Sequence, residues 1–351
     1  MAADTSAKTA SVARFSEELS AEVVAATFAD TSDPRLRDIM TSLVRHLHAF
    51  VKDVEPTVEE WAAAIGFLTD VGATCTPVRQ EFILLSDILG VSMLVETVNN
   101  RAGEATESTV EGPFHVVESP PRELGADIAL DGKGEPCLVT GTVRGPDGTP
   151  VAGAAVDVWQ ANADGFYDVQ QPELQPERNL RGLFTTDDEG RFRFRSIVPR
   201  YYPIPTDGPV GRLLEATGRH PNRPAHVHFD VRATGFRPLV THLFVADTPY
   251  IDSDAVFGVK DSLVREFPAV DDPARAAEAG LPNPFRTVHF DVVLRPEEPA
   301  ADEPAADEPA VGEPAVGEPA VGEPAVGEPA VGEPAADGPL ADDEPGERAR
   351  P

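Results

Sequence analysis

The spacing of the apolar residues changes once along this chain, near residue 103. From residue 15 to about residue 100, apolar side chains recur every three or four positions, as at Leu36, Ile39 and Leu43. This spacing predicts four or five amphipathic helices, one of them started by a capping box of Thr57 and Glu60. The last helix is expected to run unbroken over 79–98 and to be apolar on more than one face, which suits packing against a second subunit.

Beyond the connection at 103–121 the apolar residues alternate with polar ones. Turn dipeptides such as Asp147-Gly148 and Asp164-Gly165 separate the alternating segments. Short alternating strands close most easily as two packed sheets, so we expect an antiparallel β-sandwich. The strands that this pattern predicts span 138–143, 155–159, 192–194, 226–231 and 288–293.

The C-terminal segment repeats a five-residue unit, seen as Gly312-Glu313-Pro314-Ala315-Val316. Proline at every fifth position removes backbone donors, and the glutamates repel one another, so we expect an extended, disordered tail. The fold class predicted for the chain is therefore α+β with a disordered tail. Its expected parts are a flexible N-terminus (1–14), a helical domain (15–105), a β-sandwich domain (106–296) and the tail (297–351).

Composition excludes several classes of protein. The formal charge is −31, from 60 acidic and 29 basic residues, which argues against a nucleic-acid partner. No apolar run reaches the roughly 20 residues of a membrane span, and the N-terminus lacks the features of a secretory signal, so a cytoplasmic location is expected. Cys75 and Cys137 have neither a zinc-finger nor a redox spacing.

The strongest candidate for chemistry is the alternating pair His226 and His228. Residues i and i+2 of a strand point to the same face, so the two imidazoles could hold a metal, or they could be half-buried structural residues. The chain has four tyrosines, and three of them, at 167, 201 and 202, precede this strand by fewer than 62 residues. Phenolate ligands favour Fe(III), and a zinc hydrolase is the competing metal interpretation, although its HExxH motif is missing. The histidines interpreted as structural or exposed, without carboxylate companions, are His46, His48, His115 and His289.

Several motifs, in order, resemble the intradiol ring-cleaving dioxygenases. The resemblance covers roughly residues 15–295 and is carried by EGPF (111–114), DVWQANADGFY (157–167), NLRG (179–182), SIVPRYYP (196–203), TDGP (206–209) and GRHPNRPAHVH (218–228). It implies a helical dimerisation domain, a catalytic β-sandwich and one non-haem Fe(III) per subunit. It also implies a homodimer that holds a lipid between its helices, and a small aromatic diol or triol and O2 as substrates.

Carried over by motif, the implied iron ligands are Tyr167, Tyr202, His226 and His228. Tyr202 is preferred to its neighbour at 201 because it lies five residues before the aspartate of the TDGP motif, as in the family. It is also the implied base that leaves the metal when substrate binds. Arg223 matches the family arginine that lies beside the bound aromatic ring.

Within the family, segments 202–211, 214–220, 239–242 and 252–260 resemble the branch that opens hydroxyquinol (1,2,4-trihydroxybenzene) to 3-hydroxy-cis,cis-muconate. Glu111 departs from the apolar residue usual in that branch. Catechol or a chlorocatechol is the alternative substrate, and 142–154 also resembles non-catalytic prealbumin-like binding modules. The implied substrate-binding residues are Leu84, Asp87, Val110, Gly112, Pro113, Ile204 and His242.

Overall fold

The computed structural model describes residues 14–76, 79–101, 103–112, 114–115 and 119–297, all within one compact unit that spans residues 1–298. The expected flexible N-terminus and C-terminal tail lie outside the described residues, except for Arg14 and Glu297, and so does Pro113. In the described ranges, no helix is both long enough and apolar enough to cross a membrane.

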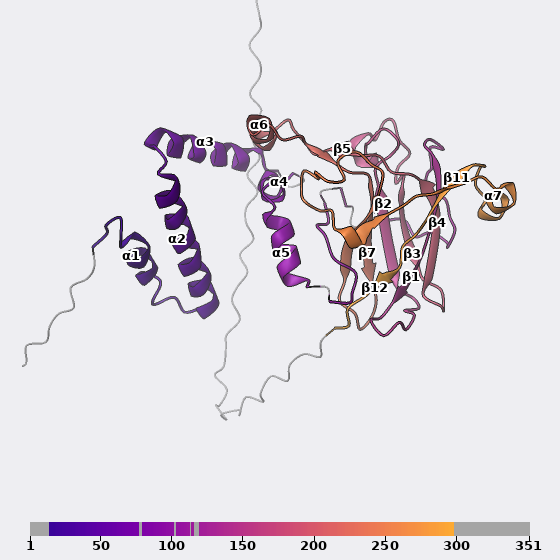
Figure 1. Ribbon diagram of the computed structural model, residues 1–351, viewed down its shortest axis with the longest axis horizontal. Helices are drawn as coiled ribbons and strands as arrows, with labels where there is room; N and C mark the ends of the chain where they lie inside the picture. Colours follow the sequence, from indigo (N-terminus) through magenta and orange to yellow (C-terminus); the bar gives the residue numbers. More distant parts are fainter. Residues whose placement is uncertain (1–13, 77–78, 102, 113, 116–118, 298–351) are drawn as a thin grey trace, which may run out of the picture. The chain divides into compact units, whose positions relative to one another are not determined.

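The N-terminal part of the described chain is helical, as the sequence predicts (Figure 1). The capping box forms, since the Glu60 amide donates to Thr57 Oγ1 at 3.1 Å and Glu60 Oε2 accepts from the Thr57 amide at 2.8 Å. The prediction of an unbroken helix over 79–98 was wrong, because Gly90 adopts φ +71° and separates two helices. The helices are α1 (Ser20–Ala26), α2 (Pro34–Val54), α3 (Val58–Thr74), α4 (Glu81–Ile88) and α5 (Val91–Asn99).

The helices expose an unusual amount of apolar surface within this chain. Val44 is the one apolar residue of α2 that is buried, and Val71 is the one in α3. Trp61 is 60% exposed and Phe50 is 59% exposed. Such apolar faces normally mark surfaces that pack against something else.

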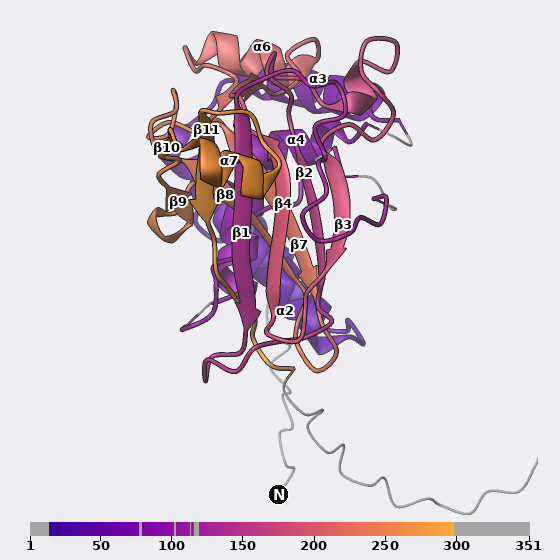
Figure 2. The ribbon, with the colours of Figure 1, turned by 90° about the vertical axis from the view of Figure 1, so that its right-hand side faces the viewer.

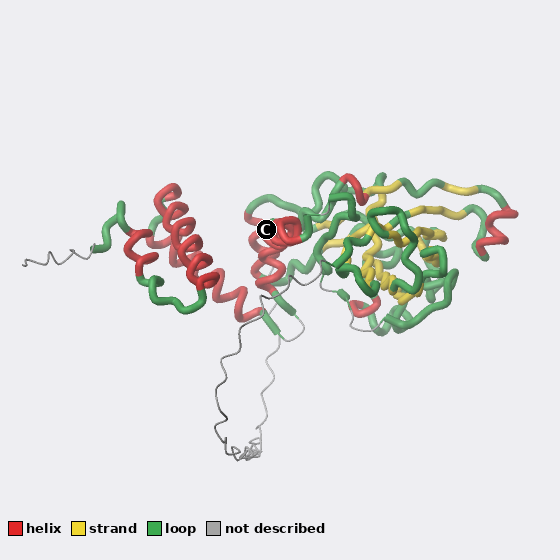
Figure 3. The backbone as a smooth tube through the Cα atoms, turned by 90° about the horizontal axis from the view of Figure 1, so that it is seen from below, coloured by secondary structure: helices red, strands yellow, loops and turns green. Residues whose placement is uncertain are grey.

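Two five-stranded sheets follow (Figures 2 and 3). In the first, the order is β10-β11-β1-β12 with β4 also paired to β1, and in the second it is β3-β2-β7-β8-β9. A separate two-stranded ladder joins β5 to β6. The strands are β1 (Pro136–Arg144), β2 (Ala155–Gln160), β3 (Arg181–Thr185), β4 (Arg191–Ile197), β5 (Tyr202–Pro203), β6 (Asn222–Arg223), β7 (His226–Arg232), β8 (Leu239–Val245), β9 (Val264–Arg265), β10 (Ala269–Val270), β11 (Phe285–His289) and β12 (Val292–Val293).

The expectation of antiparallel pairing needs a correction. Most ladders are antiparallel, but β1 runs parallel to β11 and β12, and β8 runs parallel to β9. Parallel neighbours need a long connection, and residues 246–263 supply it between β8 and β9. Between β1 and β11 the chain forms strands β2 to β10 and the helices α6 (Pro209–Ala216) and α7 (Pro273–Ala279). The strand predicted at 288–293 is also interrupted, because Asp291 Oδ1 accepts from the Thr142 amide at 3.0 Å where a backbone carbonyl would otherwise accept. The sequence pattern missed β3 and β8 and the two-residue strands β5, β6, β9 and β10.

One hydrophobic cluster joins the two sheets. Val139 and Phe194 enter it from the first sheet, and Val156 and Phe229 enter it from the second. Strand β7 contributes alternate residues to this core, so its remaining side chains, including His226 and His228, point to the opposite face. These are buried as well, because loops cover that face of β7. The fold therefore places the two imidazoles in a closed space outside the main core.

The helical part is fixed to the loop that follows β5. Arg79 donates to both carboxylate oxygens of Asp207, at 2.7 and 3.0 Å, and Glu81 Oε1 accepts from the Val210 amide at 3.1 Å. A second apolar cluster contains Leu84 and Ile204. Residues of α4 are thereby held next to the segment that carries Tyr202.

Candidate active site

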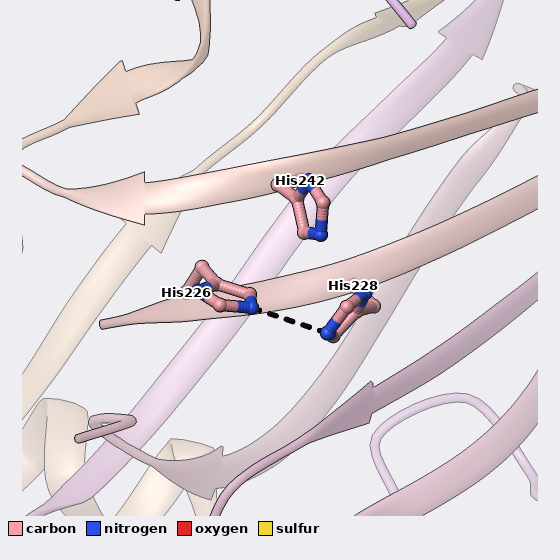
Figure 4. Close-up of side chains that lie close together, drawn as sticks. All are labelled: His226, His228 and His242. Atoms are coloured by element: carbon pink, nitrogen blue, oxygen red, sulfur yellow. Dashed lines mark hydrogen bonds between the residues drawn. The ribbon is translucent and has the colours of Figure 1, made fainter. Parts of the chain in front are cut away.

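His226 and His228 project from β7 toward one point (Figure 4). Their Nε2 atoms lie 3.1 Å apart, and His226 Nδ1 lies 2.7 Å from the carbonyl oxygen of Pro224. That carbonyl can only accept, so Nδ1 carries the proton and the Nε2 lone pair of His226 faces the site. Burial, with the nearby charge of Arg223, lowers the pKa of both imidazoles well below the usual value. Both rings are therefore neutral, as metal ligands must be.

Tyr167 reaches the same point from the loop after β2. Its hydroxyl oxygen lies 2.9 Å from His228 Nε2, and its side chain is fully buried. Burial, followed by the neighbouring Tyr202, raises the pKa of Tyr167 well above its usual value. A phenol in this position loses its proton only to a strongly polarising cation.

Tyr202 completes the group. Its ring lies 5.2 Å from that of Tyr167 and 5.5 Å from that of His226, measured between centroids. Tyr201 packs elsewhere, with its ring 5.2 Å from that of Tyr250. The structure thus brings together the four residues named from the motifs and separates Tyr201 from them.

The donor set fits iron. The Nε2 atoms of the two neutral imidazoles lie 3.1 Å apart, so that both nitrogens can face one cation. Two buried phenols beside them supply hard oxygen donors, which favour Fe(III) over softer ions. His242 offers a further nitrogen, because ligand atoms of His226, His228 and His242 all lie within 4.8 Å of one another (Figure 4).

Arg223 lies beside the imidazoles and is 2% exposed. Its Nη1 is 3.4 Å from His226 Nε2, and Asp254 accepts from its Nε at 3.2 Å and from its Nη2 at 3.3 Å. Burial works against the charge, but the Asp254 carboxylate and the two tyrosines raise the pKa of Arg223 above its usual value. A buried, permanently charged guanidinium therefore faces the site.

A cavity of about 590 Å³ opens between α4, α5 and the segment that precedes β1. Four of the implied substrate-binding residues line it, namely Leu84, Asp87, Val110 and Gly112, together with Glu111. Burial raises the pKa of Asp87. Gly112 connects this cavity to the histidines, because a Cβ at its φ of +82° would lie 3.1 Å from His228 Cε1.

Sequence reasoning missed several residues that hold the site. Trp159 stacks on His228 with centroids 4.6 Å apart, and Phe114 stacks on Tyr167 at the same distance. Thr109 Oγ1 lies 2.5 Å from His242 Nδ1. These contacts depend on strand register and loop docking. The signal in the sequence was that Phe114 and Trp159 lie within the EGPF and DVWQANADGFY motifs, which do not show what the two side chains contact.

His289 has a carboxylate companion, contrary to expectation, since its Nε2 lies 3.0 Å from Asp291 Oδ1. The expectation that His115 lacks carboxylate companions was wrong as well. His115 has two carboxylate companions, since its Nδ1 lies 2.9 Å from Glu111 Oε1 and its Nε2 lies 3.6 Å from Asp157 Oδ2. These partners come from different segments of the chain, which spacing in the sequence does not reveal.

Comparison with known protein families decides the assignment. The family model described as "Catechol dioxygenase N terminus" matches residues 33–107, and the model described as "Dioxygenase" matches residues 110–296. The chain belongs to the intradiol ring-cleaving dioxygenases. It is an iron-dependent enzyme that opens aromatic diols with O2, so the alternative of a non-catalytic binding module is rejected.

Relatives of this intradiol dioxygenase include characterised proteins of one branch. A hydroxyquinol 1,2-dioxygenase of a Rhizobium species is 59% identical over 80% of this chain and 96% of its own length. A 6-chlorohydroxyquinol 1,2-dioxygenase of Cupriavidus pinatubonensis is 54% identical over 70% of this chain and 89% of its own. The solved structure of a hydroxyquinol 1,2-dioxygenase from Pseudomonas putida superposes with a TM-score of 0.75 at 48% identity, over 80% of this chain and 99% of that one.

Proposed function

We propose that this enzyme is a hydroxyquinol 1,2-dioxygenase. It cleaves 1,2,4-trihydroxybenzene with O2 between the adjacent hydroxylated carbons, and the product is 3-hydroxy-cis,cis-muconate, the enol form of maleylacetate. The observation that carries this proposal is the position of Asp87, which lines the cavity that Gly112 connects to His228. The named activities of the relatives support the same substrate.

The metal is one ferric ion per subunit, held by Tyr167, Tyr202, His226 and His228. The nitrogen and oxygen donors that converge there support this assignment. The chemistry that such an ion supplies is withdrawal of electron density from a chelated diol, which makes the ring carbon reactive toward O2. Two phenolate ligands neutralise two of its three charges and stabilise the ferric state.

The protein residues handle protons and charge. Tyr202, as a tyrosinate, would take up one proton from a hydroxyl group of the substrate diol at its phenolate oxygen, since that oxygen and the diol would compete for the same place in the site. Arg223, buried and held by Asp254, stabilises negative charge that develops on the substrate oxygens. Its charge is already in place before substrate arrives, so no reorganisation is needed.

The cavity residues select the substrate. Asp87 accepts a hydrogen bond from the third hydroxyl group, while Leu84, Val110 and Gly112, which line the cavity, pack against the ring. Ile204 and His242 act in substrate binding from outside this lining. Catechol lacks the third hydroxyl group and leaves Asp87 without that partner. A buried polar group without a partner is costly, which gives preference for the triol.

The apolar helix faces support a homodimer in which residues 15–105 form the dimerisation domain and residues 106–296 form the catalytic β-sandwich. A lipid between the helices covers the remaining apolar surface. Leu43 on α2 is 47% exposed, so Leu43→Glu is expected to convert the dimer to a monomer in sedimentation velocity experiments. A variant that sediments as the wild-type dimer would place the interface elsewhere.

The proposed substrate is tested by O2 uptake with hydroxyquinol and with catechol at equal iron content. We expect kcat/KM for hydroxyquinol to exceed that for catechol by about 100-fold or more, as for sites that bond a substrate hydroxyl group. Equal values, or a higher value for catechol, would contradict the proposal and favour the catechol alternative.

A further inference from the structure

A second group of ligand-type side chains lies outside the site described above. Glu111, His115 and Asp230 each bring one ligand atom within 4.8 Å of the other two. Glu111 Oε1 and His115 Nδ1 are 2.9 Å apart. Asp230 is 3% exposed, so the group combines a buried carboxylate with an imidazole and a carboxylate that solvent can reach.

Asp157 and Ser119 adjoin this group and leave polar atoms unpaired. Asp157 lies directly opposite Asp230 in the β2–β7 ladder, and its Oδ2 is 3.6 Å from His115 Nε2. Within the described residues, Asp157 Oδ1, His115 Nε2 and the hydroxyl oxygen of Ser119 are buried without a hydrogen-bond partner. Ser119 is 6% exposed. Buried polar atoms are normally satisfied, so this concentration of unpaired atoms indicates a missing ligand.

The charges around His115 also favour a cation. Three carboxylates, those of Glu111, Asp157 and Asp230, lie near the guanidinium of Arg232. Arg232 donates to both oxygens of Asp230, from Nε at 3.0 Å to each and from Nη2 at 2.7 Å to Oδ2. The Arg232 side chain is 62% exposed and can turn away into solvent. A neutral imidazole nitrogen and a carboxylate oxygen repel each other at 2.9 Å unless a proton or a cation lies between them.

We propose that Glu111, His115 and Asp230 form a second metal site, which binds a divalent transition-metal ion such as Mn²⁺. One imidazole nitrogen and two carboxylate oxygens are a donor set that suits Mn²⁺ or Zn²⁺. Asp157 Oδ2, 3.6 Å from His115 Nε2, is placed to accept from that nitrogen once the metal holds the ring, as carboxylates commonly do for metal-bound histidines.

The proposed second metal site lies on the segment that packs against the proposed iron ligands. The segment that carries Glu111 and His115 also carries Gly112, which packs on His228, and Phe114, which stacks on Tyr167. His115 itself packs on Trp159 at 4.6 Å between centroids, and Trp159 stacks on His228. A cation bound there fixes the segment that borders both the substrate cavity and the iron ligands.

The test uses the full-length, iron-loaded protein and counts bound Mn²⁺ by the loss of the free-ion EPR signal. Excess Mg²⁺ occupies the weak carboxylate sites of the acidic C-terminal segment. We expect one Mn²⁺ per wild-type chain, and an at least tenfold weaker affinity in Glu111→Gln and in His115→Gln. The matched control is Glu189→Gln, an exposed glutamate paired with Arg191, which is expected to bind Mn²⁺ as the wild type does.

Iron content, measured on every variant, shows whether the fold is retained. A wild-type protein that binds no Mn²⁺ would overturn the proposal and leave a shared proton between Glu111 and His115. Equal Mn²⁺ affinity in Glu111→Gln and Glu189→Gln would overturn it as well. Substrate preference does not enter this measurement, so its outcome is independent of the proposed activity.

Discussion

Tyr202 and Arg223 are direct cross-strand partners in the two-stranded β5–β6 ladder. The proposed iron ligand and the guanidinium are therefore positioned by the same pair of backbone segments. Arg223 Nη1 also lies 3.4 Å from His226 Nε2. A displacement of this ladder therefore moves both the proposed ligand Tyr202 and the positive charge of Arg223.

The pair of Arg223 and Asp254 is buried, with side chains 3% and 1% exposed. Removing one partner leaves an uncompensated charge, so Asp254→Ala is expected to lower the free energy of unfolding by about 3–5 kcal/mol. Glu189→Ala, which breaks an exposed pair with Arg191, is expected to cost about 1 kcal/mol or less. Urea denaturation of iron-loaded protein measures both, and similar losses in the two variants would refute the assigned role of the buried pair.

Gly112 tests the contact between the cavity segment and His228. Gly112 and Gly148 share a φ of +82°, but a Cβ at Gly112 meets His228 Cε1 at 3.1 Å whereas none lies within 4 Å at Gly148. Both alanine variants should lose about 1–2 kcal/mol of stability from the left-handed backbone. Only Gly112→Ala should also bind less iron, because its methyl group displaces His228. Equal iron content in the two purified variants would show that the contact between residue 112 and His228 does not affect iron binding.

Thr109 is expected to position His242. Its Oγ1 lies 2.5 Å from His242 Nδ1, and both residues are fully buried. Thr109→Val leaves this nitrogen unsatisfied, at a cost of about 1–3 kcal/mol, so kcat/KM for hydroxyquinol should fall about tenfold. Thr109→Ser keeps the hydroxyl group and should stay within about twofold of the wild type. If the serine variant loses as much activity as the valine variant, the hydrogen bond is not what matters.

Asp87 is expected to determine the preference for a triol. With Asp87→Ala, kcat/KM for hydroxyquinol should fall about 100-fold, since the third hydroxyl group loses its acceptor. The value for catechol should change little, because catechol makes no bond there. Steady-state O2 uptake with both substrates gives the ratio of the two kcat/KM values. A variant that retained the wild-type preference for hydroxyquinol would show that Asp87 does not determine it.

The sequence pattern predicted those features of the fold that depend on residues close together in the chain. The alternation around His226 and His228 placed both imidazoles on one face of a strand, and the capping box at Thr57 forms as expected. The break at Gly90 was missed because an isolated glycine is also tolerated within a helix.

Contacts between distant segments could not be predicted in this way. Trp159 meets His228 only because β2 and β7 pair in one particular register. Thr109 reaches His242 across more than a hundred residues, and Glu111 turns toward His115 through a docked loop. Hydrophobic periodicity carries no information on register or docking. Alternation singled out His226 and His228, motif resemblance selected Tyr167 and Tyr202, and the contacts of the supporting residues came from the structure.

The central claim is that Tyr167 and Tyr202 bind Fe(III) together with His226 and His228. Its most direct test is the visible absorption spectrum of the purified protein before and after anaerobic addition of hydroxyquinol. The account predicts a tyrosinate-to-Fe(III) charge-transfer band that moves to longer wavelength with substrate, that changes in Tyr167→Phe and Tyr202→Phe, and that is unaltered in Tyr201→Phe. A protein that stays colourless after reconstitution with iron, or a band that only Tyr201→Phe alters, would contradict it.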